Sequence, residues 1–187
     1  PAPNFHPTRV FHKGADRAEE LTAMRIIAMI APDIAVPMEP DNGDDNGGGV
    51  YMRFIKGKPV RVRKTYTTQH KRDLGAIAII DAFIGNSDRH EDNAMVSQGH
   101  VHPIDHGSCF RYGVLSPNPY VMNFESFRNQ HVYEGAMAVI IRVRDNAVAL
   151  AAMMRPIKSV TPDEIRRWVK EISKDVGQEH RRKVSRW

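Results

Sequence analysis

The sequence has a single cysteine among its 187 residues, and it has no long apolar run. One thiol cannot form an intramolecular disulfide, so the fold does not depend on an oxidising compartment. The longest apolar stretches, 23–31 and 74–85, are shorter than the ~20 residues that a transmembrane helix needs, and the polar start does not resemble a signal peptide. We therefore expect a cytoplasmic protein without a membrane span.

Aromatic residues are scarce, at 7%, although hydrophobic residues as a whole make up 41% of the chain. That fraction is enough for one compact domain, or for two small lobes that share a core. The formal net charge of +5 favours an anionic partner. Nucleic acid is only weakly supported in that role, because the basic segments 56–64 and 180–187 are not interleaved with aromatic residues, and a basic tail is usually a solvated terminus.

The first third of the chain reads as a strand, a helix and a hairpin. Residues 8–13 alternate in polarity as a half-buried strand does, and helical spacing follows from 16 to 31. The segments 34–40 and 50–55 are predicted to be strands on either side of a long turn rich in glycine, asparagine and aspartate. A connector follows at 56–65.

The remainder is predicted to be mostly helical. A helix buried over most of its circumference runs from about His70 to Gly85, and a hairpin with its turn at Gln98 and Gly99 follows. Two further helices are expected, over 133–154 and from Pro162 onward. The second should begin with a capping box made by Thr161 and Glu164.

A dense polar cluster, GNSDRHEDN at 85–93, ends the buried helix. Asp88 and Asn93 stand five residues apart in it, and Asp105 follows twelve residues later across the predicted hairpin. Because a hairpin returns its two ends to one place, the three side chains should converge. Phosphoryl transfer needs a carboxylate beside the attacking hydroxyl and oxygen ligands for magnesium, and this set can supply both.

These motifs, GNSDRHEDNAMV followed by HPIDHGSCF, resemble the catalytic and metal-binding loops of the protein-kinase-like superfamily. The resemblance is closest to the branch of the phosphatidylinositol 3/4-kinases and the HipA-type bacterial kinases. It implies ATP and Mg²⁺ as cofactors, Asp88 as the catalytic base, and Asn93 and Asp105 as metal ligands. It also implies that Arg89 and His90 support the loop or face the substrate.

The same resemblance assigns roles upstream. Lys13 is expected to neutralise the nucleotide phosphates, and Glu20 in the following helix is expected to orient Lys13, with Glu19 as the competing choice. The segment 50–59 corresponds to the last strands of the small lobe and to the hinge, whose backbone holds the adenine. The match covers about residues 8–115.

The sequence departs from the family at its start. Only twelve residues precede Lys13, so the glycine-rich loop that covers the phosphates is not expected, and the glycines at 47–49 do not replace it. The predicted fold is therefore a reduced bilobal kinase-like α+β fold. Its parts are a minimal N-lobe at 1–55, a hinge at 56–65 and a mostly helical C-lobe at 66–187.

Two functions follow from this interpretation. The first is an ATP- and Mg²⁺-dependent phosphotransferase that phosphorylates a protein serine or threonine. The second is a catalytically silent kinase-like scaffold, or a nucleotide-sensing protein, that binds a protein partner in a larger assembly. Three alternatives carry less weight: a solvated loop at 85–93, a zinc site built from the histidines near Cys109, and a reactive rather than merely buried Cys109.

Overall fold

The computed structural model describes residues 10–13, 17–40, 50–62, 65–111, 113–115 and 124–184. For residues 10–13, 17, 124–125 and 183–184 the description covers the backbone alone. It combines two small antiparallel sheets with a larger helical part, which confirms the predicted α+β class. The predicted turn at 41–49 lies outside the described residues. None of the described helices is both long and apolar enough to cross a bilayer.

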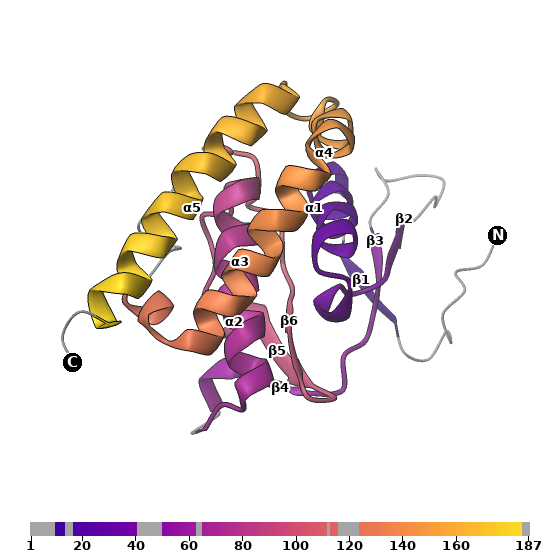
Figure 1. The fold of residues 1–187 in the computed structure, drawn as a ribbon. Helices are drawn as coiled ribbons and strands as arrows, with labels where there is room; N and C mark the ends of the chain where they lie inside the picture. The colour runs from indigo at the N-terminus through magenta and orange to yellow at the C-terminus, as the bar shows by residue number, and fades with distance from the viewer. Residues whose placement is uncertain are drawn as a thin grey trace.

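The first sheet contains three strands in the order β1-β3-β2, where β1 is Val10–Lys13, β2 is Met38–Pro40 and β3 is Val50–Arg53. All pairs are antiparallel, as the predicted hairpin requires. Helix α1, Arg17–Ile30, lies beside this sheet (Figure 1). The predicted strand at 34–40 is too long, because Pro32–Ile34 form a 3₁₀ turn and only the last three residues pair.

The second sheet has the order β4-β5-β6, formed by Lys58–Pro59, Ala94–Ser97 and His100–Pro103. The β5–β6 hairpin turns at Gln98 and Gly99, as predicted. Strand β4 was not anticipated within the connector, and it pairs with β5 at Val96 and Met95. This pairing ties the connector to the hairpin that carries the polar cluster.

In the part of the chain that the structure describes, four α-helices make up the helical part. Helix α2, Thr68–Ile84, is capped by Thr67 and packs extensively against α3, Gln130–Asp145 (Figure 1). The segment 133–154 is helical as predicted, but it is divided at Asn146, which leaves helical geometry, and α4, Ala147–Met154, follows it. Helix α5, Pro162–Val184, begins with the predicted capping box.

The core lies where these helices meet α1 and the second sheet, and its largest fully buried side chains are mainly isoleucine and phenylalanine. Phe83 of α2 packs against Trp168 of α5 with ring centroids 5.4 Å apart. Cys109 is fully buried, as predicted for a small core residue. The carbonyl groups of Phe83 and Ile84, at the end of α2, accept hydrogen bonds from the backbone N–H groups of Leu115 and Phe110. The end of α2 is thereby fixed.

Gly85 ends α2 in the left-handed conformation, with φ of 64°. A Cβ atom there would lie 1.5 Å from the carbonyl oxygen of Gly113, whereas a Cβ on Gly99, with φ of 86°, would contact nothing within 4 Å. The backbone of Gly113 therefore passes directly over Gly85. Only a residue without a side chain fits this position.

We expect Gly99→Ala to lower the free energy of unfolding by about 1–2 kcal/mol, the cost of a left-handed non-glycine residue. Gly85→Ala should cost about 1–3 kcal/mol more, because the added methyl group also displaces the backbone. Urea unfolding of the two variants and the parent protein measures both values. Equal losses for the two variants would show that the contact with Gly113 is not restrictive.

Candidate functional site: a buried ion pair beneath the polar loop

A buried ion pair lies beneath the polar loop. Asp81, fully buried in the last turn of α2, contacts the guanidinium group of Arg89 through both of its oxygens, at 2.8 Å to Nε and 3.1 Å to Nη2. The Arg89 side chain is itself only 11% exposed. Burial lowers the pKa of Arg89, but the charge and hydrogen bonds of Asp81 outweigh that effect and raise it above its ordinary value. The Arg89 guanidinium group therefore keeps its positive charge although it is buried.

The same guanidinium group joins the two ends of the β5–β6 hairpin. Its Nη1 donates to the carbonyl oxygens of Asn93 and of Ile104, the latter at 2.7 Å. Asn93 and Ile104 directly flank the last paired residues of the hairpin, and the Ile104 N–H donates to the Asn93 carbonyl at 3.0 Å. The convergence of the two motif halves is thus present in the structure.

Asp88 has a fixed backbone and an exposed side chain. Its N–H donates to Oδ1 of Asn86 at 3.0 Å, and its carbonyl accepts from Nδ2 of Asn93 at 2.9 Å. Both asparagines are buried, and Asn86 in turn donates to Asp81 at 3.0 Å. The Asp88 carboxylate makes no hydrogen bond or ion pair with the residues that the structure describes. A rigid backbone therefore presents a solvated carboxylate.

Asn93 and Asp105 bring two further oxygen-bearing side chains to the junction that Arg89 makes between the two ends of the hairpin. Because Nδ2 of Asn93 donates to Asp88, the amide is oriented, and its Oδ1 accepts no hydrogen bond within the described part of the chain. Asp105 is exposed and has a φ of 59°, a left-handed conformation that aspartate tolerates better than most residues. An amide oxygen and a carboxylate are hard ligands of the kind that magnesium prefers, so the donor set fits that ion.

Helix α1 contacts the loop that carries Asp105. Glu20 is fully buried, and its Oε2 accepts a hydrogen bond from the backbone N–H of His106 at 2.9 Å. Glu19, the competing choice, is only half-buried. The Lys13 side chain is outside the described atoms, so its pairing with Glu20 stays a prediction. The position of the Asp105 loop nevertheless depends on a carboxylate from α1.

Arg89 and His90 have contacts of loop-supporting residues. Arg89 directs its donors at buried groups, and His90 is exposed while its Nδ1 accepts the Asp92 N–H at 3.2 Å, which caps the short 3₁₀ turn Glu91–Asn93. A catalytic part for either residue remains a prediction.

An apolar slot lies beside the polar residues. It has a volume of about 180 Å³ and is lined by Met52, Phe54, Ile55, Met95 and Ile104. Ile104 directly precedes Asp105, and Met95 follows Asn93 by two residues. The structure therefore places an apolar surface next to the candidate metal ligands.

Sequence reasoning missed Asp81, Asn86 and His106. Asp81 stands in the apolar run 74–85, where a lone carboxylate signals a buried partner. That signal was available in the sequence. Its partner could not be read there, because Arg89 lies beyond the end of the helix.

A family model described as phosphatidylinositol 3- and 4-kinase matches residues 21–158. The chain belongs to this family. The match begins one residue after Glu20 and includes most of α1, the polar loop, the hairpin and Asp105. It agrees with a kinase-like phosphotransferase domain.

The chain is also similar to a protein that is named as a serine/threonine kinase. Serine/threonine-protein kinase smg-1 of Caenorhabditis briggsae is 29% identical over 91 residues, which are 48% of this chain. The chain spans only 4% of the length of that relative. The family assignment therefore rests on the model match, which covers most of the chain.

We expect Asp81→Asn to lower the free energy of unfolding by about 3–5 kcal/mol, since it leaves the Arg89 charge buried without its partner. Asp145→Asn is the matched control, because it breaks an exposed ion pair with Arg144 and should cost less than about 1 kcal/mol. Urea unfolding measures both losses. A similar small loss in both variants would contradict a dominant role for the buried pair.

Proposed function

We propose that the protein is an ATP- and Mg²⁺-dependent phosphotransferase that acts on a serine or threonine hydroxyl of a protein. The observation that carries the proposal is the junction at the open end of the β5–β6 hairpin. There Arg89 holds Asn93 and Ile104 together, and Asn93 holds the backbone of Asp88. The family membership supports the reaction class.

The apolar slot would receive the adenine ring. Its lining comes from β3, the linker that follows it, and both sides of the hairpin, and a flat aromatic base buries well against such side chains. The phosphates would then extend toward Asn93 and Asp105. Lys13, at the end of β1, would neutralise their charge, and Glu20 would keep the Asp105 loop in place.

Asn93 and Asp105 would hold Mg²⁺, which when bound neutralises charge on the phosphate oxygens. The orientation of the Asn93 amide supports this assignment, because its Nδ2 is already engaged and its Oδ1 is available. Asp88 would orient the acceptor hydroxyl and accept its proton. Its exposure suits that part, since a protein acceptor must approach from solvent.

We propose that the chain is divided into a small lobe at 1–55, a hinge at 56–65 and a helical lobe at 66–187. We also propose that the paired motif is related to that of the HipA-type kinases. The acceptor class takes support from the printed name of the relative, a serine/threonine-protein kinase. A silent, nucleotide-sensing scaffold is the competing function.

We expect ATP with magnesium to raise the melting temperature of the wild-type protein, because a ligand that binds the native state stabilises it by mass action. Asp105→Asn should lose the magnesium-dependent part of this shift while it keeps the left-handed backbone, which asparagine also tolerates. Asp175→Asn, on the exposed face of α5, removes the same charge and should respond as wild type does. A full magnesium-dependent shift in Asp105→Asn would exclude it as a metal ligand.

We expect Asp88→Asn to lower phosphate transfer from radiolabelled ATP by on the order of 10²- to 10⁴-fold, the usual contribution of a general base. Glu91→Gln, an exposed carboxylate in the same loop, should leave the transfer rate unchanged. Autophosphorylation and labelling of a generic protein substrate are the measurements. Stabilisation by ATP without any transfer by the wild-type protein would favour the scaffold, and robust transfer that depends on Asp88 would eliminate it.

A further inference from the structure

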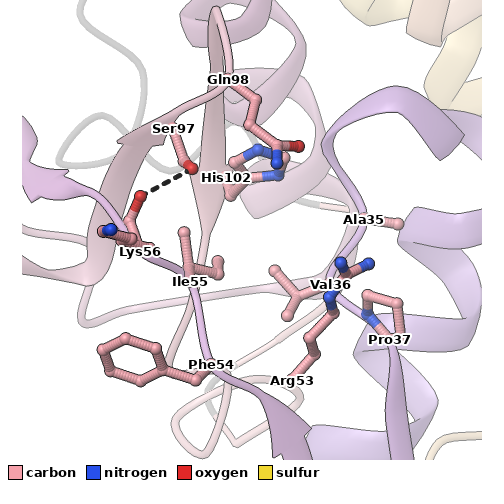
Figure 2. A pocket seen from close by; sticks show the side chains of 10 residues that line it. All are labelled: Ala35, Val36, Pro37, Arg53, Phe54, Ile55, Lys56, Ser97, Gln98 and His102. Carbon is pink, nitrogen blue, oxygen red and sulfur yellow. Dashed lines mark hydrogen bonds between the residues drawn. The ribbon is translucent and has the colours of Figure 1, made fainter. Parts of the chain in front are cut away.

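A second hollow lies on the other side of the linker that follows β3. It has a volume of about 310 Å³, and its walls are the segment 35–37 after α1, the linker residues 53–56, and the β5–β6 hairpin. Figure 2 shows the hairpin residues Gln98 and His102 facing this space from one side and Arg53 and Val36 from the other. Nothing in the proposed reaction uses this hollow.

The charged and titratable side chains of this hollow are basic. Arg53, Lys56 and His102 belong to its lining, and among the residues that the structure describes no aspartate or glutamate does. Arg53 and Lys56 are exposed, and neither side chain has a hydrogen bond or ion pair with the residues that the structure describes. Two permanently charged residues in the described lining of one hollow favour the binding of an anion there.

The hairpin side of the hollow is held in a defined geometry. The Nδ1 atom of His102 lies 3.1 Å from the carbonyl oxygen of Ile34, and because a carbonyl only accepts, Nδ1 carries the proton. Across the hollow, the Ser97 hydroxyl donates to the Lys56 carbonyl at 3.0 Å (Figure 2). These two bonds fix the distance between the linker, the hairpin and the segment after α1.

We infer that this hollow binds a phosphate-type dianion, such as the phosphate group of a small phosphate monoester. A dianion matches the two fixed charges of Arg53 and Lys56, and the guanidinium group of arginine donates to phosphate oxygens in pairs. The Gln98 amide supplies a further neutral donor from the hairpin turn. The volume leaves room for an organic group beyond the phosphate.

A ligand in this hollow would also affect the neighbouring apolar slot. Ile55 lines this hollow and also the apolar slot, so the linker is a common wall of both. An anion that draws Arg53 and Lys56 together would fix the linker and change the affinity of the slot for ATP. This second effect rests on the proposed function, whereas binding of the anion does not.

Isothermal titration calorimetry tests the binding itself. Inorganic phosphate and glycerol 3-phosphate are titrated, with acetate as the monoanion, at constant low ionic strength and at a mildly alkaline pH at which both phosphates are dianions. We expect saturable binding of both phosphates and much weaker binding of acetate. The double variant Arg53→Gln/Lys56→Gln should lose at least about tenfold in affinity, because it removes charge-assisted hydrogen bonds to the anion.

Two further variants locate the anion. Arg155→Gln/Lys158→Gln removes the same two charges from an exposed turn after α4 and should bind phosphate as wild type does. Lys13→Met should also keep phosphate binding, because Lys13 is assigned to the nucleotide. Phosphate binding that Lys13→Met abolishes and Arg53→Gln/Lys56→Gln retains would place the anion at the nucleotide site and overturn the inference. Equal losses in both double variants, or no saturable binding, would overturn it as well.

The His102 ring provides a second readout that does not depend on the variants. Its ¹H–¹⁵N signals should move with the same midpoint as the calorimetric titration, and unmoved signals at saturation would contradict binding in this hollow. Repeating the titration with ATP present then tests the coupling. Unchanged ATP affinity would remove only the coupling, and absence of ATP binding would count against the proposed function while the phosphate site stands.

Discussion

The Asp81–Arg89 ion pair is the interaction on which the rest of the candidate site depends. Removing two charges from water is costly, and the cost is offset only when their remaining donors and acceptors are also satisfied. Here they are, because Arg89 also donates to two backbone carbonyls and Asp81 also accepts from Asn86. The requirement to satisfy the pair therefore fixes the end of α2, the polar loop and the hairpin relative to one another.

The arrangement separates support from chemistry. The groups that fix the geometry, Asp81, Asn86 and Glu20, are fully buried, whereas the carboxylates of Asp88 and Asp105 are exposed. In the protein interior a hydrogen bond is stronger than in water, so buried amides can hold the backbone of Asp88 still. The exposed carboxylates remain accessible to a metal ion and an acceptor.

The linker after β3 has a comparable double character. Ile55 faces an apolar slot shared with Met95 and Ile104, and it also borders the basic hollow of Arg53 and Lys56. The pairing of β4 with β5 ties the far end of this linker to the hairpin. A flat aromatic group and an anion can thus contact one short segment from two sides. The linker therefore connects the proposed nucleotide site to the first sheet, to the segment after α1 and to the hairpin.

Several elements could be predicted from the sequence because their signals are local. Thr161 and Glu164 cap α5 across three residues, Gly85 ends α2, and the turn at Gln98 and Gly99 sets the hairpin register. The spacing of Asp88, Asn93 and Asp105 across that hairpin was enough to predict that they converge. Each of these inferences needs only neighbouring residues and the geometry of a turn.

The remaining features were decided by the tertiary structure, because they join residues far apart in the sequence. The bond from Glu20 to His106 spans 86 residues, and β4 forms only because β5 lies beside it. The sequence alone therefore determined which groups could carry the chemistry. Only the packed fold decided which buried groups hold them, because a buried charge acquires its partner when the core closes around it.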